Sequence, residues 1–192
     1  MEFSKAVLAR RSIRRYRQER VGDDALRKLI EFARVAPSGR NAQNLRFCVI
    51  RSREMVKTVF DLTAWASYVT PRRTPVWGKD APDCFIAVTV DREMQSPVAH
   101  ADAGAAIQNI LLGAVSLGLG TCWIGAFDKE KARELLGLPG SVQVLYLIAV
   151  GYPAETPVLE DASGVEQTRY YLDDKDCLHV PKLTADDLTT WI

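Results

Sequence analysis

The sequence predicts a single domain that contains both helices and β-strands. The chain has 192 residues, of which 47% are hydrophobic, and this length supplies a full-sized core. Apolar runs rich in β-branched residues predict buried strands over residues 45–50, 84–90 and 142–150. Residues 97–117 instead carry apolar side chains at helical spacing, which predicts a central helix about 30 Å long.

The N-terminal third predicts two helices joined by a basic segment. Residues 2–9 have a short apolar helical face, and Asp23 or Asp24 is a suitable N-cap for a second helix. This second helix should end near Ala36, because Pro37 disfavours the α conformation in the residue before it.

The next segments predict a strand, a helix and a loop. Residues 45–50 are apolar at adjacent as well as alternate positions, which predicts burial on both faces. Ser52 could cap a helix that continues to about Ser67. Residues 68–82 are rich in proline and basic residues, a composition typical of a loop over a site.

The second half begins with the strand over residues 84–90, which we expect at the centre of the sheet. Ser96 suits the N-cap of the long helix and Pro97 its first position, and Gly118 is placed to end it. Asp128 should cap a shorter helix that ends at Gly137. The tail predicts short strands and a last helical turn, over residues 169–172, residues 177–180, and Thr184 to Trp191. We expect residues 152–192 to be an extension of the one domain (1–192) that packs on the core or on a partner subunit.

Composition excludes several classes of protein. A formal net charge of +1 argues against nucleic-acid binding. No apolar run reaches membrane-spanning length, and no signal-peptide core is present, so we expect a cytoplasmic protein that does not enter membranes. The two histidines, His100 and His179, exclude a His-rich metal site, and we predict no metal. The cysteines form no CxxC pair and are expected to be reduced: Cys48, Cys84, Cys122 and Cys177.

The most unusual stretch is Arg10-Arg11-Ser12-Ile13-Arg14-Arg15, with four arginines in six residues of a nearly neutral chain. If the segment is extended, Arg10, Ser12 and Arg14 share one face, and Arg11 shares the other with Ile13 and Arg15. Two guanidinium groups around a hydroxyl suit a phosphate monoester. A solvated charged turn after a helix is the alternative.

Two further stretches could complete a site for a nucleotide-like cofactor. The polar loop over residues 37–44 offers the side-chain amides of Asn41 and Gln43 to the edge of a heterocycle. Backbone N–H groups near Gly125 could approach a ring closely. The glycines over residues 113–120 follow a helix rather than a strand, so they do not form a dinucleotide-binding fingerprint.

From residue 5 to about 155 the chain resembles the FMN-dependent nitroreductase family. Five stretches in the family's order carry the resemblance: Arg10-Arg11-Ser12-Ile13-Arg14, Ala36-Pro37-Ser38-Gly39-Arg40-Asn41-Ala42-Gln43, Asp102-Ala103-Gly104-Ala105-Ala106-Ile107-Gln108-Asn109, Gly118-Leu119-Gly120-Thr121-Cys122-Trp123-Ile124-Gly125 and Val150-Gly151-Tyr152-Pro153. The resemblance implies an α+β fold: three α-β-α layers with a central mixed, mainly antiparallel sheet, in an intertwined homodimer.

The resemblance also implies a bound FMN at the subunit interface and NAD(P)H as electron donor. The FMN phosphate and ribityl chain would be held by Arg10, Ser12 and Arg14, with Arg11 beside them. The flavin would be reached from the partner subunit by Pro37, Ser38, Gly39, Asn41 and Gln43. Backbone along the ring would come from Cys122, Trp123, Ile124 and Gly125, although packing in the core is an alternative for Cys122 and Trp123. Asp102 and Gln108 could simply satisfy polar groups near the interface, and His100 suits a polar helix residue better than a catalyst.

Two departures from the family pattern concern the margins of this site. Asn44 and Leu45 stand where the family often has proline and an aromatic residue. No base follows Gly151-Tyr152-Pro153 closely, so Arg169 or Lys182 could complete the phosphate site.

The leading hypothesis is a ping-pong oxidoreductase that passes electrons from NAD(P)H through FMN to a small organic acceptor such as a nitroaromatic compound or a quinone. Arg14 or a backbone N–H would stabilise the reduced ring, and Arg40 would face the acceptor. The alternatives are other flavin chemistry (dehalogenation, ring dehydrogenation or flavin fragmentation), a non-catalytic FMN-binding or storage protein, and a structural dimer without cofactor.

Overall fold

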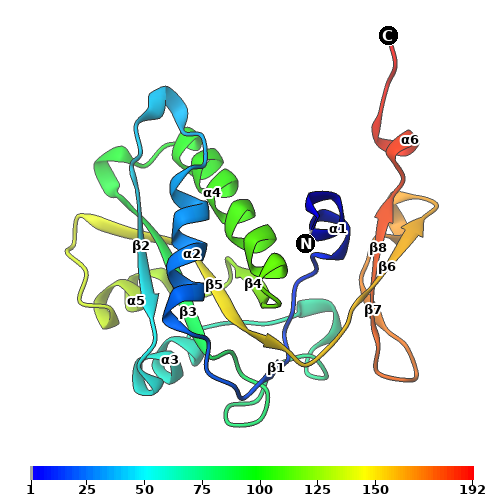
Figure 1. Cartoon of the computed structure of the whole chain (residues 1–192), viewed down its shortest axis with the longest axis horizontal. Coiled ribbons are helices and arrows are strands. Elements are labelled where there is room, and N and C mark those ends of the chain that lie inside the picture. Colours follow the sequence, from blue (N-terminus) through cyan, green and yellow to red (C-terminus); the bar gives the residue numbers. More distant parts are fainter. Residues whose placement is uncertain (1) are drawn as a thin grey trace.

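The computed structural model describes residues 2–192, and its centre is a five-stranded antiparallel sheet (Figure 1). Strand β3 (Cys84–Asp91) lies between β2 (Leu45–Ile50) and β5 (Val142–Pro153). The opposite edge of β5 pairs with both β1 (Tyr16–Arg17) and β4 (Gly120–Ile124). The first seven residues of β3 are buried, which confirms the prediction of a central strand.

Helices cover both faces of this sheet. Side chains of β3 alternate between the faces: Ile86 and Val88 pack in the cluster beneath α2 (Asp23–Arg34) and α4 (Pro97–Ser116). Phe85 and Ala87 pack on the other side, with α3 (Arg53–Phe60) and α5 (Lys129–Leu135). The α+β class and the three-layer α-β-α arrangement are therefore confirmed.

The bounds of α4 follow from the local signals at its ends. The Ser96 hydroxyl accepts a hydrogen bond from the N–H of Ala99 at 3.2 Å, and Pro97 is the first helical residue. Gly118 has a φ of 74°, a left-handed conformation that glycine adopts without steric cost. The helix thus has the predicted N-cap and the predicted terminating glycine.

Two predictions about the first half are wrong. Strand β2 is at the sheet edge and is mostly half-buried rather than buried on both faces. Helix α3 ends at Phe60 instead of near Ser67. Its end is fixed by side chains, because the Thr63 hydroxyl donates to the Phe60 carbonyl at 2.6 Å and the Trp65 indole donates to the Thr63 hydroxyl at 2.7 Å.

Smaller corrections concern helix ends. Gly22 is the N-cap of α2, so both aspartates lie inside its first turn. Their negative charge there interacts favourably with the positive end of the helix dipole. Thr184 does cap α6, but this helix covers only Ala185–Leu188 because Thr189 is already extended. Short 3₁₀ turns, not assigned from the sequence, occur at η1 (Gly39–Asn41), η2 (Ser67–Val69), η3 (Arg92–Met94) and η4 (Val165–Gln167).

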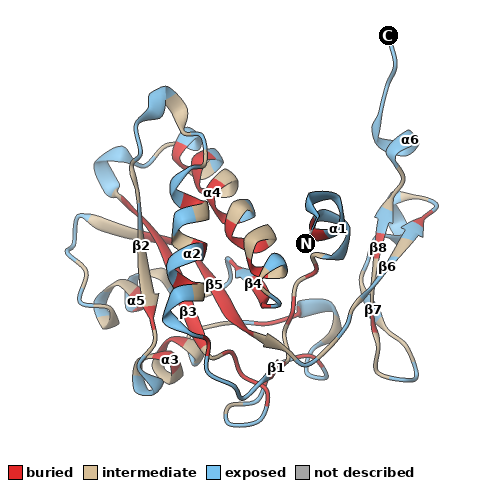
Figure 2. Cartoon of the chain, viewed as in Figure 1, coloured by how far each residue is buried: buried red, intermediate tan, exposed pale blue. Residues whose placement is uncertain are grey.

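The tail forms a second, three-stranded sheet. Strand β8 (Leu178–Leu183) pairs in parallel with β6 (Val158–Ala162) and antiparallel with the short β7 (Tyr171–Leu172). The sequence predicted β7 and β8 approximately, but not β6. This sheet and α6 lie to one side of the layered body, beyond α1 (Phe3–Ala9) (Figure 1). Strand β6 and α6 are mostly exposed, whereas β8 is mostly buried or half-buried (Figure 2).

Candidate functional site

The arginine segment is extended and runs beside the start of β4. The N–H of Ile13 donates to the Thr121 carbonyl at 2.9 Å, and Ser12 forms a parallel bridge with Thr121. The side chain of Ile13 fills the space above Gly120, where an added Cβ would lie 2.8 Å from Ile13 Cγ1. Glycine at 120 therefore lets the segment lie against the strand.

Burial alternates along this segment as an extended backbone requires. Arg11 and Ile13 are buried, whereas Arg10, Ser12 and Arg14 are half-buried and form the opposite face. The sequence predicts an anion site from the guanidinium groups of Arg10 and Arg14 and the hydroxyl of Ser12. The alternation places these three groups on the face opposite Arg11 and Ile13. The extended interpretation is confirmed over the turn alternative.

These arginines carry charge that no carboxylate neutralises. Within residues 2–192, none of Arg10, Arg11 and Arg14 forms an ion pair with an acidic side chain. Arg11 Nη1 donates to the carbonyl of Arg10, and its buried Nε has no partner among these residues. Burial lowers the pKa of Arg10 and of Arg11 below the ordinary value, because desolvation disfavours the charged form. An anion bound here would relieve this unfavourable electrostatic state.

A buried carboxylate that sequence analysis missed holds the backbone of the segment. Glu155 Oε1 accepts the N–H groups of Arg14 and, at 3.1 Å, of Arg15. Glu155 Oε2 lies 3.2 Å from Nε of Arg73, and both of these side chains are at least 95% buried. A carboxylate on the backbone amides fixes the segment's shape while its side chains stay free for a ligand.

Arg73 lies in the loop over residues 68–82, and this loop links the tail (residues 152–192) to the arginine segment. Asp176 Oδ2 lies 2.6 Å from Arg15 Nη1 and 3.4 Å from Arg73 Nη1, and Asp176 Oδ1 lies 3.2 Å from Arg72 Nη2. The hydrogen bond from Arg15 lowers the pKa of Asp176, with smaller contributions from the other two arginines. Arg15 is thus a structural cation, unlike Arg14 beside it.

Strand β4 offers backbone rather than side chains to this site. Cys122 and Ile124 are buried in the core cluster on the α3 side of the sheet, so packing is the role of the Cys122 side chain. Trp123 is 38% exposed, and its ring meets Tyr146 edge-on at 5.1 Å. Because the Thr121 carbonyl points to the arginine segment, the backbone of Trp123, two residues on, faces the same edge.

Gly125 follows β4 directly, and the surroundings of this glycine are open. An added Cβ would lie 3.9 Å from the Tyr146 ring, an ordinary contact distance. The packing within this chain therefore does not demand glycine at 125. A molecule that approaches the backbone from outside would demand it.

The loop over residues 37–43 lies on the N-terminal part of α4. The N–H of Gly39 donates to Asp102 Oδ1 at 2.9 Å, so Asp102 satisfies a backbone group as the sequence alternative proposed. Three residues of the loop that are not glycine have left-handed backbones, with φ of 55° at Arg40, 52° at Asn41 and 50° at Gln43. Strain of this kind is typical of functional loops, because the surrounding structure must maintain it.

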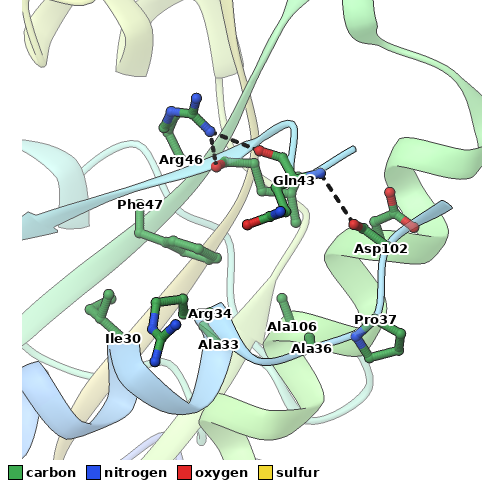
Figure 3. Close-up of a pocket in the computed structure, with 12 residues that line it drawn as sticks. Ile30, Ala33, Arg34, Ala36, Pro37, Gln43, Arg46, Phe47, Asp102 and Ala106 are labelled. Carbon is green, nitrogen blue, oxygen red and sulfur yellow. Dashed lines mark hydrogen bonds between the residues drawn. The ribbon is translucent and has the colours of Figure 1, made fainter. Parts of the chain in front are cut away.

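A cavity of about 440 Å³ lies between this loop, α2, β2 and α4 (Figure 3). Gln43 and Pro37 line it from the loop, Asp102 from α4 and Phe47 from β2. Arg46 also lines it, and Arg46 Nη1 donates to the Gln43 carbonyl at 2.9 Å. Such a volume suits a small organic molecule.

The predicted site residues form two groups rather than one. The loop contacts the first third of α4 through Asp102, whereas the arginine segment contacts Thr121, just beyond the C-terminal end of α4. Figure 1 shows η1's loop and α1 near opposite ends of this helix, which is about 30 Å long. Within one chain, the two groups do not meet.

The remaining candidates have simpler surroundings. His100 Nδ1 lies 3.1 Å from the Tyr146 hydroxyl, and Gln108 is exposed. Arg169 lies over the Tyr68 ring at 4.6 Å, and Lys182 is exposed on β8. On the open face of the segment, the tail contributes Tyr170, whose ring lies 5.2 Å from the Arg14 guanidinium carbon.

Comparisons with known proteins agree with this architecture. The model of the nitroreductase family matches residues 7–152. A protein of Archaeoglobus fulgidus provisionally named NADH dehydrogenase/NAD(P)H nitroreductase is 32% identical over 163 residues, which cover 80% of this chain and 87% of that protein. The FMN reductase [NAD(P)H] of Bacillus subtilis is 30% identical, with 80% of this chain and 67% of that protein covered.

A solved structure gives the same result. A Desulfovibrio desulfuricans protein described as a nitroreductase was crystallised with FMN and is 33% identical to this chain. The match covers 86% of this chain and 94% of that one, with a TM-score of 0.68. The sheet with helices on both faces thus defines an α+β protein of this fold. The chain belongs to the nitroreductase family.

Proposed function

We propose that this protein is an FMN-dependent oxidoreductase that takes electrons from NAD(P)H and passes them to a small organic acceptor by a ping-pong mechanism. Family membership and the names of the relatives support the cofactor and the donor. None of the helices within residues 2–192 is long and apolar enough to cross a membrane. The acceptor and the order of the steps are our proposal.

The observation that carries the proposal is the unneutralised charge of the arginine segment. Arg10 and Arg14 flank Ser12 on the open face, and no acidic side chain of residues 2–192 pairs with either. A phosphate accepts bidentate hydrogen bonds from guanidinium groups. The residues present therefore fit the phosphate of FMN, with Arg11 contributing charge from the buried face.

The other groups have complementary roles. FMN, when bound, supplies the hydride-transfer chemistry. The backbone from Cys122 to Gly125 would hold the flavin ring, and an N–H there would stabilise negative charge on it. Arg14 would serve the same purpose. The reaction requires no side-chain acid or base, because water would protonate the product.

We further propose that the complete site forms in a homodimer. Pro37, Ser38, Gly39, Asn41 and Gln43 lie too far along α4 to join the arginine segment of their own chain, so a second copy would supply them. Arg40 is exposed in this loop, and we propose that it faces the acceptor. A preference for electron-rich or anionic acceptors would follow from its charge.

The test is FMN binding and reduction by defined variants. Arg14→Gln and Ser12→Ala should each weaken FMN binding, Arg14→Gln by about 10- to 100-fold because hydrogen bonds to charged groups contribute about 1.5–3 kcal/mol. Flavin fluorescence titration gives the Kd. Arg17→Gln is the control, since Arg17 is exposed and pairs with Glu19 at 2.9 Å.

Anaerobic addition of NADH or NADPH to the FMN-loaded protein should bleach the visible spectrum. A spectrum that persists with both donors would contradict the reductase and favour storage or another flavin chemistry. Absence of any FMN binding would contradict the assignment of the arginine segment itself.

A further inference from the structure

Three possible metal ligands meet in the tail, away from the proposed flavin site. They are Asp173, at the end of β7, and Cys177 and His179, at the start of β8, and their donor atoms all lie within 4.8 Å of one another. The sequence predicts no metal because it contains only two histidines. The hairpin nevertheless brings one of them to a thiol and a carboxylate.

His179 is oriented as metal-binding histidines are. Its Nδ1 is hydrogen-bonded to Glu160 Oε1, and its Nε2 lies 3.3 Å from Asp173 Oδ2. The Tyr171 ring stacks on the imidazole at 4.8 Å, and its hydroxyl donates to Glu160 Oε2 at 3.0 Å. A carboxylate on one ring nitrogen fixes the tautomer and aims the other nitrogen at a metal.

Asp173 presents one oxygen in the same direction. Its Oδ1 accepts the N–H groups of Lys175 at 2.9 Å and Cys177 at 2.7 Å. Oδ2 is thereby held toward His179 Nε2. These hydrogen bonds leave Oδ2, Nε2 and the Cys177 sulfur as the converging donors.

We propose that Asp173, Cys177 and His179 bind one divalent zinc ion, with water at the fourth position. Sulfur, nitrogen and oxygen together suit zinc, a borderline-soft metal that accepts all three. Bond lengths of about 2.0–2.3 Å imply ligand separations of roughly 3.3–3.8 Å in a tetrahedron. The Cys177 thiol donates to the Thr156 carbonyl at 3.9 Å, and zinc binding would replace this weak contact and draw the three donor atoms together.

The ion would tie the end of β7 to the start of β8. Asp176, which pairs with Arg15 of the arginine segment and with Arg72 and Arg73, lies in the same turn. Zinc would therefore stiffen the part of the tail that contacts the proposed flavin site. The competing arrangement is a protonated His179 that donates to both carboxylates with no metal bound.

The first experiment titrates the FMN-loaded protein with zinc chloride against a chromophoric chelator. We expect one zinc per chain, with binding weakened at least 100-fold in Cys177→Ser and in His179→Gln. Glu160→Gln should weaken it about 10- to 100-fold through the orientation of His179. Cys48→Ser is the control and should bind zinc like the parent, because Cys48 lies in β2.

A second readout needs no variant. Burial raises the pKa of Cys84 to about 12 and raises the pKa of Cys48 and of Cys122, so these thiols react slowly at pH 8. Half-buried Cys177 should alkylate first, and zinc should protect it. Lack of zinc binding, or binding with unprotected Cys177, would overturn the proposal and support the protonated cluster. Neither result would affect the FMN assignment, which is measured by flavin fluorescence.

Discussion

Arg14 and Arg15 are neighbours with different electrostatic surroundings. The Arg15 guanidinium is paired with Asp176 at 2.6 Å and lies 3.8 Å from Asp80. The Arg14 guanidinium instead lies over the Tyr170 ring and forms no ion pair within residues 2–192. The difference arises because successive side chains of an extended segment point to opposite sides. One side faces acidic residues of the fold, and the other is free for an anion.

Glu155 should be the most sensitive single residue near the site. Removal of one member of a buried ion pair leaves an uncompensated charge and costs about 3–5 kcal/mol. Glu155→Ala should therefore lower the free energy of unfolding by about 3 kcal/mol and weaken FMN binding, because Arg14 and Arg15 lose their shared acceptor.

Urea denaturation measures the stability change. Glu19→Ala is the matched control, since the pair of Glu19 with Arg17 is half-exposed and should contribute less than about 1 kcal/mol. Equal losses in the two variants would mean that Glu155 is not the anchor of the segment.

At the scale of elements, α4 is the helix that contacts the loop over residues 37–43 and packs against α2. It packs on α2, and an added Cβ at Gly113 would lie 2.1 Å from Cδ2 of Phe32. At Gly104 the nearest atom would be 3.8 Å away, in Trp123. A side chain at position 113 would therefore clash with Phe32, whereas a methyl group at position 104 would fit without a clash.

Gly113→Ala should destabilise the protein by about 1–3 kcal/mol, because the Phe32 ring must leave its position. Gly104→Ala should stabilise it by about 0.5–1 kcal/mol, the usual gain when a helical glycine is replaced without a clash. Thermal unfolding of both variants tests the pair. A loss of stability in Gly104→Ala would show that this face of α4 is occupied by another molecule or subunit.

At the scale of the whole molecule, the tail is too apolar for the exposure it has in one chain. Leu188 and Trp191 are 71% and 88% exposed, and Phe3 and Leu8 of α1 are also exposed. Figure 2 shows that α1 and α6 are mostly exposed. We propose that the second copy would cover this apolar surface in the homodimer.

The double substitution Leu188→Ser with Trp191→Ser should weaken the dimer at least tenfold, because burial of one large apolar side chain contributes about 1.5–3 kcal/mol. Analytical ultracentrifugation over a concentration series gives the dissociation constant. Val76→Ser, at another exposed apolar position, should leave it unchanged. A dimer unaffected by the double substitution would place the tail outside the interface.

Much of the fold follows from local signals. The cap at Ser96, the glycine at 118 and the apolar runs of β3 and β5 each act through neighbouring residues, so the sequence alone determined these elements. The end of α3 could not be predicted, because it depends on Thr63 and Trp65 folding back on Phe60. Strand β6 was not predicted for a similar reason, because it is a strand only through its parallel pairing with β8.

The site divides in the same way. The alternation of arginine and serine in an extended segment is a local property, and the sequence by itself determined which side chains share the open face. Only the tertiary structure decided that Glu155 holds their backbone, that the loop over residues 37–43 lies far along α4, and that Asp173, Cys177 and His179 converge. Contacts between distant residues depend on how whole elements pack, and no short-range pattern in the chain encodes that packing.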